Sequence, residues 1–264
     1  MATDSIFEFL YSNFANTTTQ LTVDSNSGTV QNIINPDTRI QYYSDGCNND
    51  AVTVSLTVSF DATTTISRIA LKEFNLKKFR IYYNGATANT FALTTTCATT
   101  SSNFLTNSET SMFMRCTSVD CTSVTIDMYS TQVANSEKAI GYLALSKQLI
   151  AFERIPAAAD YSPKIDPEQV MHVMSDGGTR LHTVKEKYAI DIKFKHISRS
   201  FRDDLKDVYE LRAPFMFAPF GTTTGWDTVL FECVWPGNFD FHKFSDNAVS
   251  SGFSGSIQLR ETSS

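Results

Sequence analysis

The stretch AVTVSLTVSFDATTTISRIALKEFNLKKFRIYYNG, residues 51–85, carries the clearest pattern in this chain of 264 residues. Across residues 52–60, apolar side chains alternate with serine and threonine, a period of two that indicates a strand with one buried face. The polar run 61–65 predicts a turn, residues 66–71 a second strand and residues 79–83 a third. Three successive strands with polar connectors are typical of an antiparallel sheet, and none of these residues is arranged for catalysis.

The composition favours a folded protein that is rich in sheet. Hydrophobic residues make up 42% of the chain, which is ample for a core, and its 20 Phe and 10 Tyr suit a pleated, half-buried surface. The formal charge of −6 divides into −3 for residues 1–150 and −3 for residues 151–264. Neither half is a basic nucleic-acid surface, so we expect no recognition of a nucleic acid sequence.

The N-terminal sequence MATDSIFEFL is acidic and lacks the positive start of a signal peptide. No segment approaches the run of about 20 apolar residues that spans a bilayer, so we expect no membrane insertion. The five cysteines are an odd number, which favours reduced thiols made in a cytoplasm. A bridge between Cys116 and Cys121 is the alternative.

Residues 1–150 are predicted to form a β-sandwich, or jelly roll. After the opening stretch, residues 86–110 have the composition of a loop with weak strands, while residues 124–128 and 140–145 continue the strand pattern. About seven short strands with no convincing helix between them are typical of this fold. The composition changes at residues 151–169, which are rich in proline. We predict that this segment is a linker, or an arm that clamps a neighbouring subunit.

Residues 170–264 are predicted to be α+β, an antiparallel β-barrel or sheet with one packed helix. A hairpin is expected around Asp176-Gly177-Gly178, and a strand with alternating faces at residues 188–194. The helix is predicted near residues 199–212, capped by Ser198 or Ser200, with acidic residues in its first turn. Its apolar face consists of Phe201, Leu205, Val208 and Leu211.

The usual signatures of chemistry are missing from the sequence. The four histidines have no metal-ligand spacing, and neither a nucleophile elbow nor a phosphate-binding glycine loop is present. The turn 45–50 has several oxygen ligands that could hold Ca²⁺, although its spacing matches no known cage. We therefore predict no catalytic residue, no cofactor and no metal, and a protein that is not an enzyme.

A basic cluster extends from the second predicted strand into the third and could attract an anionic polymer. Glu73 interrupts it, which favours the simpler interpretation that these side chains coat a solvated sheet edge. The cluster consists of Arg68, Lys72, Lys77, Lys78 and Arg80.

Residues 29–145 resemble the discoidin, or coagulation-factor C-type, family. The residues that carry the resemblance are Asn32-Ile33-Ile34-Asn35, the strands at 66–71 and 79–84, and the pair of strands at 124–128 and 140–145. The resemblance implies a galactose-binding-like jelly roll, whose members often bind glycans through loops at one end. No binding residue of the family can be matched here.

Residues 170–262 resemble the barrel-plus-helix domains of bacteriophage tail proteins. The matching pieces are residues 188–194, the helix through Leu211, Pro214–Phe220 and the closing segment 252–261. Such domains form rings that continue the tail tube. A jelly roll joined to a tail-tube-like domain is similar to a distal tail protein, or baseplate hub, of a phage.

The resemblance implies a structural subunit of a phage tail tip or baseplate. It would form a ring of three or six copies by contacts between subunits, and join the tail tube to tip proteins or fibres. Other tail proteins, and a host surface glycan, would be its further partners; it would be made in the host cytoplasm and reside in the virion. The candidate subunit interface consists of Pro214, Phe217, Pro219, Phe220, Trp226, Gly252 and Phe253.

The rival hypothesis is a monomeric glycan-binding module that recognises sugar through aromatic loops. It predicts sugar affinity in the first 150 residues and no ring. An enzyme would need a cluster of polar side chains that the sequence does not reveal.

Overall fold

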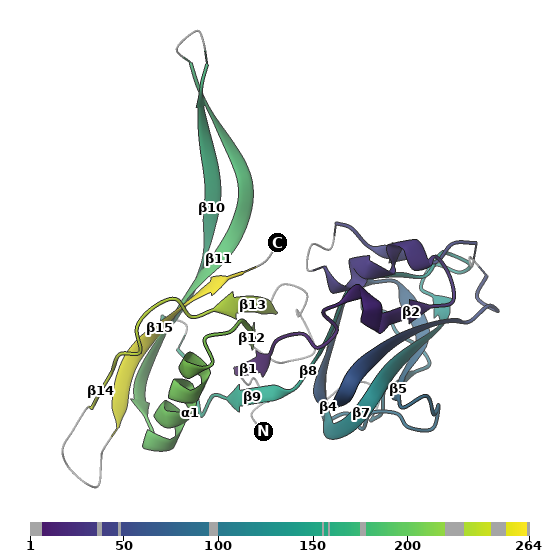
Figure 1. Ribbon diagram of the computed structural model, residues 1–264, viewed down its shortest axis with the longest axis horizontal. Coiled ribbons are helices and arrows are strands. Elements are labelled where there is room, and N and C mark those ends of the chain that lie inside the picture. Colours follow the sequence, from purple (N-terminus) through teal and green to yellow (C-terminus); the bar gives the residue numbers. More distant parts are fainter. Residues whose placement is uncertain are drawn as a thin grey trace. The chain divides into compact units, whose positions relative to one another are not determined.

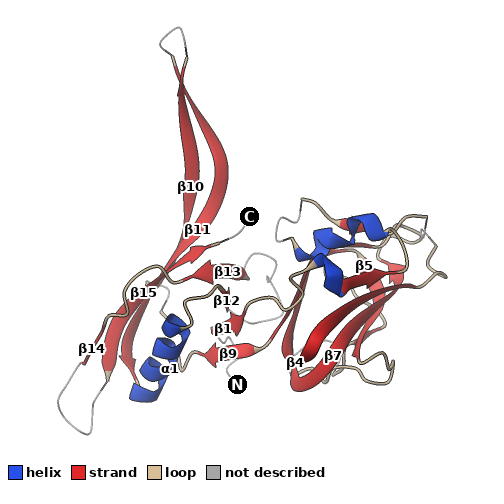
Figure 2. Cartoon of the chain, viewed as in Figure 1, coloured by secondary structure: helices blue, strands red, loops and turns tan. Residues whose placement is uncertain are grey.

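The computed structural model describes residues 7–35, 39–46, 49–94, 100–154, 156–157, 159–174, 178–219, 230–243 and 252–262. The chain divides into two compact units, the first mainly Leu10–Gln148 and the second mainly Leu149–Phe217 with Phe231–Ser264. Antiparallel strands dominate both, which confirms the predicted fold class: a mainly β protein with one packed helix (Figure 2). No helix in the described part of the chain is long and apolar enough to cross a membrane.

The first unit is a β-sandwich built on a seven-stranded sheet of order β3-β8-β4-β7-β5-β6, with β2 paired to β4. Two short 3₁₀ helices, η1 (Thr18–Gln20) and η2 (Ser27–Ile34), precede most of these strands. The strands are β2 (Leu21–Val23), β3 (Tyr42–Tyr43), β4 (Val54–Phe74), β5 (Leu76–Tyr83), β6 (Asn103–Phe104), β7 (Met112–Thr131) and β8 (Ala139–Ser146).

The turn predicted at residues 61–65 is wrong, because β4 runs without a break from Val54 to Phe74. The run is rich in threonine, whose β-branched side chain favours an extended backbone. A register shift between Ser59 and Thr64 lets β4 stay paired with β7 on both sides of the run. Thr65 donates its hydroxyl to the Asp120 carboxylate across the strands at 2.6 Å.

The second unit contains an eight-stranded sheet of order β10-β11-β15-β13-β12-β1-β9, with β14 paired to β15. Its described pairings make an open sheet, one of the two forms that the sequence predicts. The strands are β1 (Glu8–Tyr11), β9 (Gln148–Ala151), β10 (Tyr161–Val173), β11 (Thr179–Ile197), β12 (Phe215–Ala218), β13 (Phe231–Val234), β14 (Phe241–Lys243) and β15 (Phe253–Glu261). Of the linker or arm expected at 151–169, residues 161–169 lie in β10.

The α-helix found among the described residues, α1 (Arg199–Glu210), lies where the sequence predicts it. The Ser198 hydroxyl accepts a hydrogen bond from the Phe201 N–H at 3.0 Å, so Ser198 and not Ser200 is the cap. Phe201, Leu205 and Val208 are buried, whereas Leu211 follows the helix and is 45% exposed. Leu211 is the C-terminal cap with a helical backbone, and the chain leaves the helix direction only at Arg212, where φ is +50°. The two aspartates that follow Arg202 lie in the second turn, not the first.

An aromatic cluster forms the core of the second unit. Phe217 is fully buried, and its ring centre lies 5.5 Å from that of Phe9 and 5.9 Å from that of Phe7. Phe152 contacts Phe194 of β11 and Phe201 of α1, and the second contact joins the helix to the same cluster. The density of phenylalanine in this part of the sequence therefore serves mainly for packing.

Candidate functional site

The β10–β11 ribbon is the most unusual surface of the second unit (Figure 1). β15 pairs with β11 only from Ala189 to Ile197, whereas β10 continues to pair with β11 as far as Val173 and Thr179. Nine residue positions of β10, Ile165–Val173, are thus supported by β11 alone, a length of about 30 Å. An isolated two-stranded hairpin is marginally stable in water.

Apolar side chains cover one face near the tip of this ribbon. Met171 and Leu181 are direct cross-strand partners, and Val173 follows two positions along on the same side. Their exposed fractions are 65%, 61% and 71%, far above those of the core residues. Next to them, His172 and Arg180 form a pair that faces the opposite side. Met171, Leu181 and Val173 thus form the apolar face of the ribbon, which no described residue covers, and Val170, 42% exposed, lies on the opposite side with His172 and Arg180.

The outer edge of β10 does not favour the addition of another strand. β10 ends the strand order of the sheet, and it contains Pro163 and Pro167, which have no N–H to donate. A partner of the ribbon would pack on its face instead of extending its hydrogen-bond ladder.

A second candidate surface lies on the outer face of the first unit, where β4, β7 and β5 run side by side. Ser55, Asp127 and Arg80 occupy one row across the three strands. Thr57, Thr125 and Tyr82 occupy the next row. The alternate residues of these strands, such as Leu56 and Ile126, belong to the core. We call this surface the polar face; it consists of these two rows together with Tyr129 and Lys78.

Asp127 is the centre of the polar face. Its carboxylate is buried and accepts hydrogen bonds from the Ser55 hydroxyl at 2.8 Å and from the Tyr82 and Tyr129 hydroxyls at 3.3 Å each. Burial, followed by the charge of Asp127, raises the pKa of both tyrosines, so each keeps the proton that it donates. These contacts fix the positions of both phenol rings.

Two cations flank Tyr129 on the same face. The Lys78 ammonium lies 5.2 Å from the centre of the Tyr129 ring, and the Arg80 guanidinium carbon lies 6.0 Å from it. Neither cation has an ion pair with an acidic residue in the described part of the chain. The Nε atom of Arg80 is buried and has no hydrogen-bond acceptor there. The polar face thus has donors in excess.

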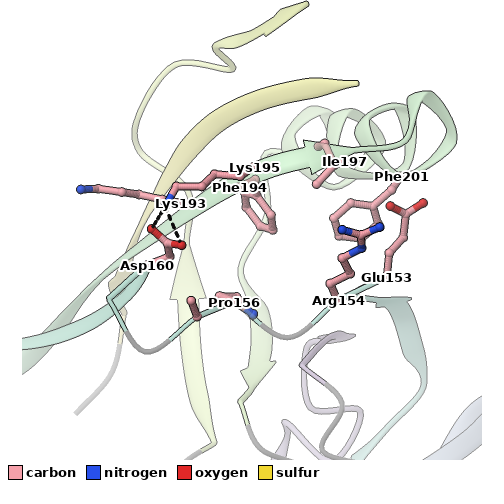
Figure 3. A pocket seen from close by; sticks show the side chains of 10 residues that line it. Glu153, Arg154, Pro156, Asp160, Lys193, Phe194, Lys195, Ile197 and Phe201 are labelled. Carbon is pink, nitrogen blue, oxygen red and sulfur yellow. Dashed lines mark hydrogen bonds and ion pairs between the residues drawn. The ribbon is translucent and has the colours of Figure 1, made fainter. Parts of the chain in front are cut away.

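A small pocket lies in the second unit beside the start of α1 (Figure 3). Its volume is about 90 Å³, less than the few hundred Å³ of an ordinary ligand pocket. Its acidic residues already have partners: Asp160 accepts from Lys195 Nζ at 2.8 Å, and Glu153 accepts from the N–H and the hydroxyl of Ser198. These contacts hold the segment before β10 against β11 and the N-terminal cap of α1, so we assign the pocket a structural role.

The turn considered for Ca²⁺ has a cation of the protein beside it. Lys138 is fully buried, and its ammonium donates to the Asn49 carbonyl at 3.5 Å. Slight burial opposes ionisation of Asp50, but hydrogen bonds from Thr131 and Asn135 and the charge of Lys138 hold the pKa of this carboxyl below its ordinary value. Within the described ranges, no group of three or more His, Cys, Asp or Glu could hold a metal ion.

No protein-family model matches this chain, and no curated protein matches it. Several solved structures are similar in fold to part of this chain. Chitosan-binding module 1 from a chitosanase/glucanase of Paenibacillus sp. IK-5 is 11% identical, with 51% of this chain and 98% of that chain covered, at a TM-score of 0.38. A pectin-binding carbohydrate-binding module is 20% identical, with 47% and 87% covered, at 0.34. CpGH89CBM32-5 of Clostridium perfringens, in complex with GalNAc-β-1,3-galactose, is 11% identical, with 51% and 99% covered, at 0.37.

At these identities and TM-scores, the function of this chain has to be argued from its own residues.

The candidate interface residues do not converge on one surface. Phe217 belongs to the aromatic core and Pro219 is buried, whereas Pro214 is exposed. Gly252 and Phe253 lie at the start of β15, where the Arg202 guanidinium is 4.8 Å from the centre of the Phe253 ring. Phe220 and Trp226 lie outside the described residues. As an interface, this set stays a prediction.

Sequence reasoning missed both surfaces. The strands of this hairpin were expected, but their apolar residues have the pattern of any buried strand, and only the structure shows that no described residue covers them. Ser55 and Asp127 are 72 positions apart, so the polar face arises from strand pairing and has no local signature. Arg68, expected on a solvated edge, is instead buried and donates to Gln148 at 2.5 Å.

Proposed function

We propose that this protein is an assembly subunit, and that the apolar face of its β10–β11 ribbon binds a second copy of the chain. The observation that carries the proposal is the exposure of Met171, Leu181 and Val173 on a ribbon without a third strand. Fully burying one such side chain stabilises a structure by about 1.5–3 kcal/mol. Three of them could offset the marginal stability of the hairpin only once a partner covers it.

Cross-linking between isotopically distinct copies tests this proposal. A mixture of ¹⁴N- and ¹⁵N-labelled full-length chains is treated with a lysine-reactive linker and analysed by mass spectrometry. Lys164, whose side chain is 63% exposed at the base of the ribbon, should give links that join light and heavy chains. Lys206 on α1, 50% exposed, is the comparison site. Links from Lys164 that stay within one chain at high protein concentration would contradict the proposal.

The finer form of the proposal is a ring of three or six copies in a phage tail tip. It rests on the sequence resemblance, and negative-stain images of the purified chain test it. Closed rings would support it, and pairs or open chains of copies would oppose it, because a contact whose rotation does not close makes a filament.

Carbohydrate binding by the first unit is the second candidate function. The polar face favours it, because an aromatic ring beside fixed hydroxyl, carboxylate and guanidinium groups can both stack on a sugar and bond its hydroxyls. This is also the class of ligand named for the similar structures. A glycan array probed with the full chain and with Tyr129→Ala tests this function. We expect signals that the variant loses, and signals that are equal for both proteins would rule out the polar face.

The two roles are compatible. A weak sugar site that is repeated on every copy of an assembly binds a polysaccharide far more tightly than one site does.

A further inference from the structure

We propose that the polar face of the first unit selects acidic saccharides, through the Lys78 and Arg80 side chains that lie beside the Tyr129 ring. This inference rests on the carbohydrate-binding candidate and adds the chemical class of the ligand. Its basis is the juxtaposition of two cations that lack acidic partners in the described structure with an aromatic ring and hydroxyl groups.

The charges of the polar face do not balance within the protein. Asp127 is the acidic group nearest to Arg80 in the sheet, since the two residues are cross-strand partners. However, its two oxygens already accept from Ser55, Tyr82 and Tyr129, and no ion pair with Arg80 forms. The negative charge accepts from hydroxyl groups, whereas the two positive charges contact the Tyr129 ring but no carboxylate among the described residues. An anionic ligand would supply the missing acceptor.

The Nε–H group of Arg80 is buried and has no hydrogen-bond acceptor among the described residues. A buried N–H without a protein acceptor costs free energy, and in native proteins an ordered water, an ion or a ligand can pair with such a group. A guanidinium binds a carboxylate or sulfate through two parallel hydrogen bonds, which a neutral hydroxyl cannot match. Arg80 is half-buried, so its outer nitrogens are the atoms that would reach the ligand.

The rest of the polar face suits a saccharide better than a simple anion. Tyr129 offers a ring that Asp127 holds in place, and a pyranose can stack on it. Ser55 and Thr57 lie half-buried in adjacent rows and offer hydroxyl groups to a sugar. Lys78 is exposed at the margin, where its flexible ammonium could reach the acid group of the next residue of a chain.

Calorimetry with the full chain and a matched pair of ligands tests the inference. The probes are a galacturonic acid hexamer and the same hexamer with its carboxylates methyl-esterified, which removes the charge and keeps the sugar. The variants are Arg80→Gln and Lys78→Gln. Arg199→Gln and Lys206→Gln on α1 are their controls, with the same loss of charge at exposed sites of the second unit. Circular dichroism and a urea titration check that each variant folds.

We expect the acid form to bind at least about tenfold more tightly than the ester, and Arg80→Gln to remove on the order of tenfold in affinity. Lys78→Gln, at an exposed position, should weaken binding less, and added salt should weaken it further. Equal binding of acid and ester would overturn acid selectivity while leaving the carbohydrate-binding candidate standing. If neither hexamer binds and the glycan array is empty, both proposals fail. Equal losses in the α1 controls would reduce the effect to net charge and overturn the site.

Discussion

Met171 and Leu181 lie directly opposite each other on β10 and β11, and 65% and 61% of their surfaces are exposed. A cross-strand apolar pair normally lies under a second layer. Here β15 ends before reaching the pair, and no described residue forms a second layer over it. We infer that a second copy covers this face.

Hydrogen exchange should show that the ribbon is ordered only in the assembly. In the full chain at high concentration, we expect the amides of residues 165–173 to exchange at least about tenfold more slowly than in Met171→Lys/Leu181→Lys, because a covered ribbon opens less often. His172→Lys adds one charge to the opposite face and should leave the protection intact. Equally fast exchange in all three proteins would mean that nothing covers the apolar face.

Phe217→Ala separates a core role from an interface role. Because Phe217 is fully buried among Phe7, Phe9 and Phe152, its loss should lower the free energy of unfolding by about 3–5 kcal/mol. A urea titration of the full chain measures this, and Phe253→Ala, at a half-buried position, should cost less. If Phe217→Ala keeps the full stability of the wild type but no longer assembles, Phe217 is an interface residue, as the sequence predicts.

Ser198→Ala tests the helix cap. The Ser198 hydroxyl accepts from the Phe201 N–H and also contacts Glu153, so removing it should cost about 1–2 kcal/mol in a urea titration. Ser200→Ala, inside α1, should be neutral or slightly stabilising, since alanine is the better helix former. Ser198→Thr retains a hydroxyl and should recover most of the loss. A larger loss of stability in Ser200→Ala than in Ser198→Ala would mean that Ser198 is not the cap.

The buried thiols predict a loss of stability at alkaline pH. Burial raises the pKa of Cys116 to about 12 and that of Cys121 to about 11, from an ordinary value of 9.0. Since the unfolded thiols ionise first, the folded state holds more protons above pH 9, and its stability falls as the pH rises through this window.

Unfolding midpoints of the wild type and of Cys116→Ala/Cys121→Ala, measured between pH 8 and about pH 11, check this prediction. The double variant should lose less stability over this range than the wild type does. Parallel curves would show that the two thiols do not contribute. Mass-spectrometric mapping at pH 8 should find Cys116 and Cys121 unmodified by a thiol reagent in the folded chain, since the thiolate is the reactive form.

Local pattern predicted what depends on local chemistry. The strand predicted at residues 52–60, the helix cap and the pairing of β10 with β11 follow from local spacing. The strand begins only at Val54, however, which leaves Val52 exposed, and Asp176 and Gly177 of the predicted turn lie outside the described residues. The polar run 61–65 was misread, since threonine suits both a turn and a strand and only the pairing with Cys121 and Asp120 decides between them. The four-residue strand of Phe217 could not be told from a contact surface without the partners that bury it.

The candidate surfaces depend on long-range pairing, so they could not be predicted. Asp127 meets Ser55 and Tyr82 only because β7 lies between β4 and β5. The basic cluster was seen in the sequence, but its members separate in the fold: Arg68 is buried with partners, and Lys78 and Arg80 flank a tyrosine. Residue composition cannot distinguish those environments.

Light scattering across a range of concentrations measures the mass of the full chain in solution and so shows whether a second copy binds the ribbon. We expect a mass that rises from that of one 29.4 kDa chain towards a whole-number multiple of it, while Met171→Lys/Leu181→Lys stays at one chain and His172→Lys follows the wild type. A wild-type mass of 29.4 kDa at every concentration, equal to that of the double variant, would contradict it.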